Sequence, residues 1–190
     1  VGRAGGVAAR QVYVPRGGRC ADRQAWVEVR CGGAWHFLGA CEPEEVLDTG
    51  WFSGPANRAI LIHTRNFSDY VKESNEEYLG KEGALYYFNH TDFYGRTKLV
   101  KILVKDENGK PAAGAHIAVE ILNMAEFFPA AVMIADADGE VRMTLGLGDI
   151  RVRAFDGIRR AEAMMRIEEE DSLELVLREE AVPEADDRWQ

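Results

Sequence analysis

Residues 131–155 have the sequence AVMIADADGEVRMTLGLGDIRVRAF, and this stretch indicates the fold of the C-terminal half of the chain. Short apolar runs alternate in it with turn signals, of which Asp138-Gly139 is the clearest. An Asp-Gly or Asn-Gly pair between two such runs is typical of a hairpin. The pattern extends outward over residues 97–178, where Asn108-Gly109 is a second hairpin signal. Seven short strands with a turn about every ten residues predict an antiparallel β-sandwich. The expected strands are residues 99–105, 115–122, 131–135, 140–145, 149–155, 160–167 and 172–177.

The N-terminal part of the chain predicts a second, smaller antiparallel sheet. Gly32-Gly33 is a two-residue loop of the kind that permits positive φ, so the strands on either side of it should form a hairpin. A hairpin alone is only marginally stable in water and needs further strands or a helix against it. Residues 67–83 are polar and mixed, and they suggest a surface helix or loop. The expected strands are residues 11–14, 25–31, 34–40 and 84–89.

The composition excludes several classes of protein. Of the 190 residues, 46% are hydrophobic, which is too many for a disordered chain. No window approaches the roughly 18 consecutive apolar residues of a membrane span. The formal net charge of −9 argues against a nucleic-acid partner, although −8 of it lies in residues 168–190, and residues 179–190 are expected to be an acidic tail. Three cysteines are too few for a disulfide scaffold, and their number is odd.

No motif predicts a metal or a cofactor. The four histidines and three cysteines lack the paired spacing of a zinc site. Residues 136–139, DADG, resemble the start of a calcium loop, but no glutamate follows at its twelfth position, so a turn is expected. Gly146-Leu147-Gly148 precedes a strand, so it does not form a phosphate cradle at the start of a helix. Glycosylation sequons begin at Asn66 and Asn89, and we interpret both as idle.

Two cysteines have charged neighbours that bear on a role as nucleophile. Cys20 stands beside Arg19 and Arg23, which favour a thiolate, but no histidine is close in sequence. Cys41 stands next to Glu42, whose charge raises the pKa of a thiol. We interpret both as structural or incidental.

Longer tracts carry a resemblance to a known family. The tracts are GVAARQVYVPR at 6–16, AWVEVRCGGAWHFLGACEPEEVLDTGWF at 25–52, NRAILIHTRNF at 57–67, and ILNMAEFFP with DADGEVRMTLGLGD within 121–149. Together they resemble the bacterial transglutaminase-like proteins over most of residues 1–155. The resemblance implies the antiparallel-sheet half of a papain-like core followed by an Ig-like or transthyretin-like β-sandwich, a mainly β chain that is α+β overall. The implied domains are residues 1–65 for the core, 66–96 for a connecting segment and 97–178 for the sandwich.

The family's chemistry uses a Cys-His-Asp triad, in which a thiolate attacks a carbonyl and the histidine moves the proton. The resemblance puts the cysteine upstream of GVAAR, so we expect this chain, which does not begin with Met, to be a C-terminal portion. It puts the histidine at Gln24, whose amide has no titratable nitrogen near neutral pH. It puts the acid at Gly39, and Glu42 is the nearest carboxylate that could serve instead. Cys20 lies on the wrong element to replace the missing cysteine.

Three interpretations stay open. The first is a transglutaminase-like protein that is inactive because Gln24 replaces the base, and that binds where its relatives cleave. The second is an active cysteine peptidase or amidase with a relocated base, for which His36 is the example. The third is a sandwich that acts as a binding or interaction module on a vestigial core. In each, the partner is a protein or peptide, without nucleic acid or cofactor, and the family favours a location outside the cytoplasm.

Overall fold

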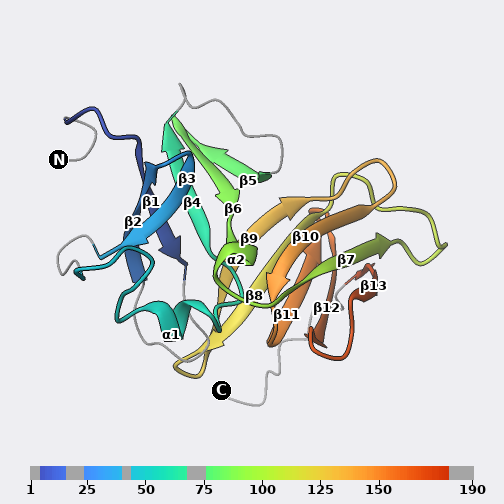
Figure 1. The fold of residues 1–190 in the computed structure, drawn as a ribbon. Coiled ribbons are helices and arrows are strands. Elements are labelled where there is room, and N and C mark those ends of the chain that lie inside the picture. Colours follow the sequence, from blue (N-terminus) through green and yellow to red (C-terminus); the bar gives the residue numbers. More distant parts are fainter. Residues whose placement is uncertain (1–4, 16–23, 40–43, 68–75, 180–190) are drawn as a thin grey trace, which may run out of the picture.

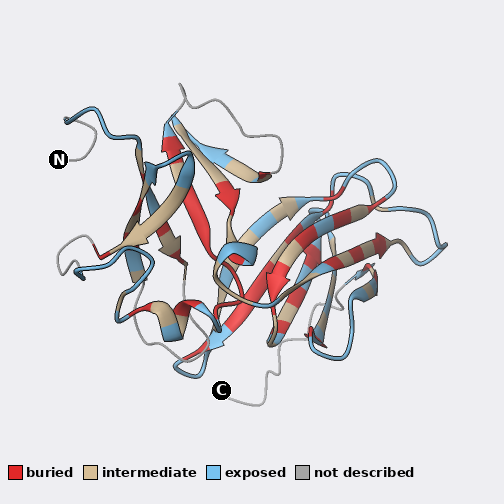
Figure 2. Cartoon of the chain, viewed as in Figure 1, coloured by how far each residue is buried: buried red, intermediate tan, exposed pale blue. Residues whose placement is uncertain are grey.

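The computed structural model describes residues 5–15, 24–39, 44–67 and 76–179, which form two β-rich units side by side (Figure 1). The chain is mainly β, as the sequence predicts, and the described helices are single turns. The six-stranded sheet lies on the left of Figure 1 and the sandwich on the right, and buried residues run through both (Figure 2).

The N-terminal unit is an antiparallel sheet with the strand order β3-β2-β1-β4-β6-β5. The hairpin of β2 and β3 turns through Gly32 (φ 58°) and Gly33 (φ 87°), so the predicted loop is confirmed. The strands are β1 (Ala9–Val14), β2 (Gln24–Cys31), β3 (Ala34–Leu38), β4 (His63–Phe67), β5 (Glu77–Glu82) and β6 (Leu85–Asn89). The helices are α1 (Ser53–Ala56) and α2 (Thr91–Tyr94).

One face of this sheet is covered and the other is partly open to solvent. Val12 pairs with Trp26 on one side and with Thr64 on the other, and all three side chains are buried. Trp26 stacks on Phe52, just before α1, with ring centroids 4.5 Å apart, and meets the Tyr94 ring of α2 edge-on at 5.1 Å. Because side chains alternate along a strand, the register defines two sets. The covered face carries Arg10, Val12, Val14, Gln24, Trp26, Glu28, Trp35, Phe37, Thr64 and Phe88, and the open face carries Gln11, Tyr13, Val27, Val29, Cys31, His36 and His63.

The C-terminal unit is a sandwich of a three-stranded sheet, β10-β7-β13, and a five-stranded sheet, β14-β12-β11-β8-β9. Apolar residues at alternate positions of both sheets, Ile102 and Val152 among them, are fully buried between the layers. The sandwich differs from the prediction in one pairing, since β13 runs parallel to β7. The strands are β7 (Thr97–Lys105), β8 (His116–Asn123), β9 (Glu126–Ile134), β10 (Glu140–Gly146), β11 (Asp149–Phe155), β12 (Arg159–Arg166), β13 (Ser172–Val176) and β14 (Arg178–Glu179).

The two predicted hairpin signals form turns, but neither joins partners within one sheet. Gly109 and Gly139 have φ of 79° and 73°, and the carboxylates of Asp106 and Asp136 accept backbone N–H groups across their turns. Each turn carries the chain from one layer of the sandwich to the other, from β7 to β8 and from β9 to β10. The turns are therefore confirmed, and the assignment of their flanking strands to hairpins is wrong. The residues of a turn set its local geometry, but contacts with distant strands set which sheet each flanking strand joins.

The two units are joined by a tight, buried junction. Ile60 packs into the sandwich core and Ile62 into the core of the first sheet, so one short segment belongs to both. The backbone N–H of Gly146 donates to the carbonyl of Ile60 at 2.8 Å. A Cβ on Gly146 would lie 2.0 Å from the Ala59 carbonyl oxygen, so only glycine permits this approach. The Thr144 N–H also donates to the Glu77 carboxylate of β5 at 3.0 Å.

Strand β5 corrects the prediction of a surface helix or loop for residues 67–83. Its polar side chains gave no strand signal, and the strand forms because β5 pairs with β6 across a turn at Gly83 (φ 57°). Residues 68–75 lie outside the described residues. The segment 66–96, expected as a connection, contributes β5, β6 and α2.

Candidate functional site

Gln24, the predicted site residue, is the first residue of β2 and pairs with Val14 of β1. It lies on the covered face, two residues before the buried Trp26, and is itself half-buried. Its amide has no hydrogen-bond partner among the described residues. An amide in this position can donate to a carbonyl or accept from an N–H, but it cannot take a proton from a thiol near neutral pH.

Further along the same face lies a buried ionic cluster centred on Glu28. The Nε of Arg10 donates to Glu28 Oε2 at 2.6 Å, and the Nη1 of Arg10 donates to Glu76 Oε1 at 2.8 Å. The Arg10 guanidinium also lies over the Trp35 ring, with Cζ 4.0 Å from the ring centroid. Burying charges is tolerated only when they are paired and hydrogen-bonded, and Arg10 and Glu28 are both.

Three further side chains complete this cluster, which we call the Glu28 network. The Tyr94 hydroxyl donates to Glu28 Oε1 at 2.5 Å and accepts from Trp26 Nε1 at 2.7 Å. The Nε2 of His90 lies 3.2 Å from Glu28 Oε1 and 3.2 Å from the Nη2 of Arg10. The network therefore comprises Arg10, Trp26, Glu28, Glu76, His90 and Tyr94.

The network keeps Glu28 ionised. Burial raises the pKa of this carboxyl, but His90, Arg10 and Tyr94 lower it by more, so the pKa lies below its usual value. Burial and the neighbouring Glu28 charge raise the pKa of the Tyr94 hydroxyl. A fully buried carboxylate surrounded by donors is suited to holding β1, β2, Glu76 and α2 together, which fixes the strand that begins at Gln24.

His90 is the histidine that sequence reasoning missed on the covered face. Its side chain is 16% exposed, and it reaches Glu28, not Gln24. Four residues of strand separate Glu28 from Gln24, which is about 13 Å. His90 therefore does not occupy the position where the family resemblance puts the histidine. The sequence offers no signal for it, because His90 follows β6 and meets β2 only through the fold.

The other positions that the family resemblance points to lie outside the described residues or carry no side chain. Glu42, Cys20 and Cys41 lie outside the described residues. Gly39 follows β3 and carries no side chain. Cys31, a free and exposed thiol, is at the opposite end of β2 from Gln24 and on the open face.

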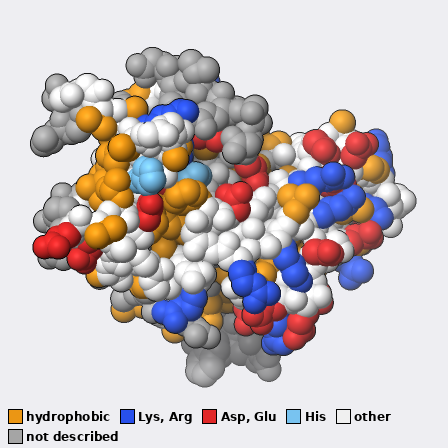
Figure 3. Space-filling model, in the orientation of Figure 1, with side chains coloured by type: hydrophobic (Ala, Val, Ile, Leu, Met, Phe, Trp, Pro, Cys, Tyr) orange, Lys and Arg blue, Asp and Glu red, His pale blue; other side chains and the backbone are white. Residues whose placement is uncertain are grey.

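His36 forms an ordered pair that the sequence did not predict. Its Nδ1 lies 2.7 Å from Asp48 Oδ2, while Asp48 Oδ1 accepts the Phe37 N–H at 3.0 Å. The Asp48 backbone has a φ of 63°, and its N–H donates to the Phe37 carbonyl, which holds the carboxylate against β3. His36 pairs with Val29 and therefore lies on the open face, on the other side of the sheet from Gln24. On the face of the molecule seen in Figure 3, histidine side chains lie among hydrophobic side chains in the half of the view that the six-stranded sheet occupies.

The two sequon asparagines lie in buried positions, away from the surface. Asn66 and Asn89 are buried, with exposed fractions of 0% and 6%. Asn89 donates to the Thr144 carbonyl at 2.6 Å and so belongs to the junction. Within the described ranges, no three His, Cys, Asp or Glu side chains gather as metal ligands. Nor is any helix of these ranges long and apolar enough to cross a membrane.

Comparison with known proteins gives little similarity. No family model and no curated protein sequence matches the chain. A solved structure titled "Structure of the Streptococcal ancillary pilin" is similar over 90% of this chain, with a TM-score of 0.35 and 9% sequence identity. The chain spans 62% of the length of that pilin chain.

Proposed function

We propose that the chain is part of a transglutaminase-like protein that holds a peptide or other amide-bearing partner without cleaving it. The observation that carries the proposal is Gln24 at the position where the family resemblance puts the histidine. Acyl transfer by a thiol needs a base that accepts the thiol proton, and a glutamine amide does not supply one. The same amide can pair with a peptide group through one donor and one acceptor.

The described thiol, that of Cys31, is not placed to react beside Gln24. Cys31 is seven residues along β2 from Gln24, about 23 Å for an extended strand, and points to the other face. No thiol of the described residues lies on the covered face beside Gln24. The Glu28 network, meanwhile, anchors β2 by an ion pair between Arg10 and Glu28, whose side chains are 2% and 0% exposed.

The test is an assay of the full-length native protein for hydrolysis of a glutamine-containing peptide and for transfer of its acyl group to a primary amine. We expect no iodoacetamide-sensitive activity in the wild type, because no base stands at position 24. Iodoacetamide-sensitive turnover by the wild type would refute the proposal. In the variant Gln24→His, new thiol-dependent turnover would show that the base is the missing element.

A matched control is Gln11→His, which adds a histidine on β1 of the same sheet but on its open face. This variant should stay inactive, since its imidazole is on the wrong side. Binding of the glutamine peptide can be followed by calorimetry. Weaker binding by Gln24→Ala, with Gln11→Ala unchanged, is the expected result for a partner held at Gln24.

A second candidate, a relocated base, is favoured by the 2.7 Å contact of His36 with Asp48. A carboxylate on Nδ1 orients an imidazole as a base, and Cys31 lies diagonally across the β2–β3 hairpin on the same face. Alkylation of Cys31 by iodoacetamide should then slow several-fold in His36→Gln. Equal rates in both proteins would remove this candidate.

A further inference from the structure

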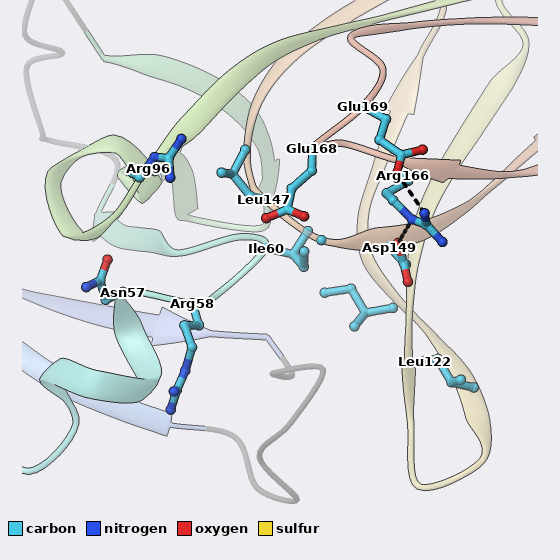
Figure 4. Close-up of a pocket in the computed structure, with 12 residues that line it drawn as sticks. Asn57, Arg58, Ile60, Arg96, Leu122, Leu147, Asp149, Arg166, Glu168 and Glu169 are labelled. Atoms are coloured by element: carbon cyan, nitrogen blue, oxygen red, sulfur yellow. Dashed lines mark hydrogen bonds and ion pairs between the residues drawn. The ribbon is translucent and has the colours of Figure 1, made fainter.

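A cavity of about 740 Å³ lies at the junction of the two units (Figure 4). Its volume is in the range of about 300–1,000 Å³ that small-ligand sites occupy. The first unit and the linker contribute Asn57, Arg58 and Arg96 to one side, and the sandwich contributes Asp149, Arg166, Glu168 and Glu169 to the other. Ile60 and Leu147 lie between these two sides in Figure 4 and supply an apolar floor.

The floor is held rigidly by close backbone packing. The Gly146 N–H donates a hydrogen bond to the Ile60 carbonyl oxygen. A Cβ on Gly148 would lie 2.5 Å from the Ile60 side chain, so the two segments are in close contact. The Ile167 N–H donates to the Gly148 carbonyl at 3.0 Å. The backbone on the two sides of the cavity therefore keeps a fixed spacing, and the exposed side chains of Arg58, Arg96 and Glu168 extend from it.

The charges of the two sides are opposite and partly unpaired. Arg58 and Arg96 have no hydrogen-bond or ion-pair partner among the described residues. Arg166 is neutralised by Asp149 at 3.3 Å and by Glu169 at 2.8 Å.

Glu168 is left as the unpaired acid of the sandwich side. Its carboxylate has no partner among the described residues, and the Nζ of Lys98 donates to its backbone carbonyl oxygen at 2.7 Å. The carboxylate points toward the middle of the cavity in Figure 4. A ligand that carries both a negative and a positive group would pair with both sides of the cavity at once.

We propose that this cavity binds a short peptide in its zwitterionic form. Its carboxylate lies against Arg96, which is beside Leu147 in Figure 4, its ammonium group faces Glu168, and its apolar middle covers Ile60 and Leu147. The site goes beyond the proposed function and does not depend on it, since the cavity and the Gln24 face share no lining residue.

The experiment uses alanine oligopeptides of two to six residues with free termini as probes. Each added residue lengthens an extended chain by about 3.3–3.6 Å, so the series measures the spacing between the two sides. Binding is followed by ¹⁵N NMR, with the Gly148 and Leu147 amides as reporters. We expect saturable shifts at these amides with an optimum length. Shifts that stay linear up to the solubility limit would overturn the proposal.

Blocked probes and matched variants identify which side holds which end. Arg96→Gln should weaken binding of the peptide with free termini about fivefold and leave binding of the peptide with a C-terminal amide unchanged. Glu168→Gln should weaken binding of the peptide with free termini about fivefold and leave binding of the N-acetylated peptide unchanged. Arg142→Gln, an exposed arginine outside the cavity, is the control and should change neither. Equal effects of a variant on both blocked probes would refute the charge assignment. Unchanged thermal unfolding verifies that each variant is folded.

Discussion

The imidazole of His63 should make the protein lose stability in mild acid. Its side chain, on β4, is buried between Tyr13 and Tyr87, with ring centroids 6.0 Å and 5.3 Å away. Burial, and then the charge of Arg65, lower the pKa of His63 to about 4, against an opposing hydrogen bond with the Thr64 backbone. The unfolded chain therefore binds a proton near pH 6.5, while the folded protein does not until about pH 4.

The sign and size of the effect follow from linkage. Because the pKa of His63 is lower in the folded protein, His63 does not change the free energy of unfolding well above about pH 6.5. As the pH falls from about 6.5 toward about 4, the free energy of unfolding decreases. At about 1.36 kcal/mol per unit, the full loss is about 3 kcal/mol. About 2 kcal/mol of it is already lost between about pH 7 and about pH 5. Glu28, whose pKa lies below its usual value, loses its contribution only at lower pH, so this window reports on His63.

The assay is urea unfolding at a series of pH values, with His63→Phe as the test variant and His116→Gln as the control. Phenylalanine keeps the aromatic contacts but cannot bind a proton, and His116 is exposed. The wild type and His116→Gln should lose about 2 kcal/mol more than His63→Phe between about pH 7 and about pH 5. Equal losses in all three proteins would refute the reasoning, as would an NMR titration that gives His63 an ordinary pKa.

Three further predictions concern stability measured by urea unfolding near neutral pH. Glu28→Ala should lower the free energy of unfolding by about 3–5 kcal/mol, because it leaves buried partners without their carboxylate, and Glu28→Gln should lower it by less. Equal losses in the two variants would show that the charge of Glu28 does not matter for stability. Gly146→Ala should cost about 3 kcal/mol because its Cβ would meet a backbone oxygen at 2.0 Å, whereas Gly54→Ala has open space and serves as the control. Met124→Asn with Ala125→Gly should stabilise the protein by about 1 kcal/mol, since both residues have positive φ in the β8–β9 turn; a destabilised double variant would contradict this turn assignment.

Much of the fold could be predicted because its signals are local. Alternating apolar runs and Gly or Asp-Gly turns located the strands of the sandwich and the β2–β3 hairpin. The β8–β9 hairpin was missed in part, because Met124 and Ala125 turn the chain without the usual glycine or asparagine. The start of β9 was accordingly placed too late.

The candidate site was less predictable, because its partners are far apart in the sequence. Arg10 contacts Glu28 across β1 and β2, but it also contacts Glu76, 66 residues away, and His90, 80 residues away. No spacing rule connects such positions. The pair of His36 and Asp48 was missed for the same reason, although only 12 residues separate them, since a loop returns Asp48 to the edge strand.

What depends on neighbours along the chain could be inferred from the sequence alone: the mainly β class, the position of most strands, the turns, and the fact that position 24 carries an amide. These follow from side-chain alternation, from the φ range of glycine and from the chemistry of an amide. Tertiary structure decided the rest. It set which layer each strand joins, which face His36 takes relative to Gln24, and how the Glu28 network and the junction cavity assemble. Those outcomes depend on burial and charge pairing between distant segments, which have no signature in any single stretch of sequence.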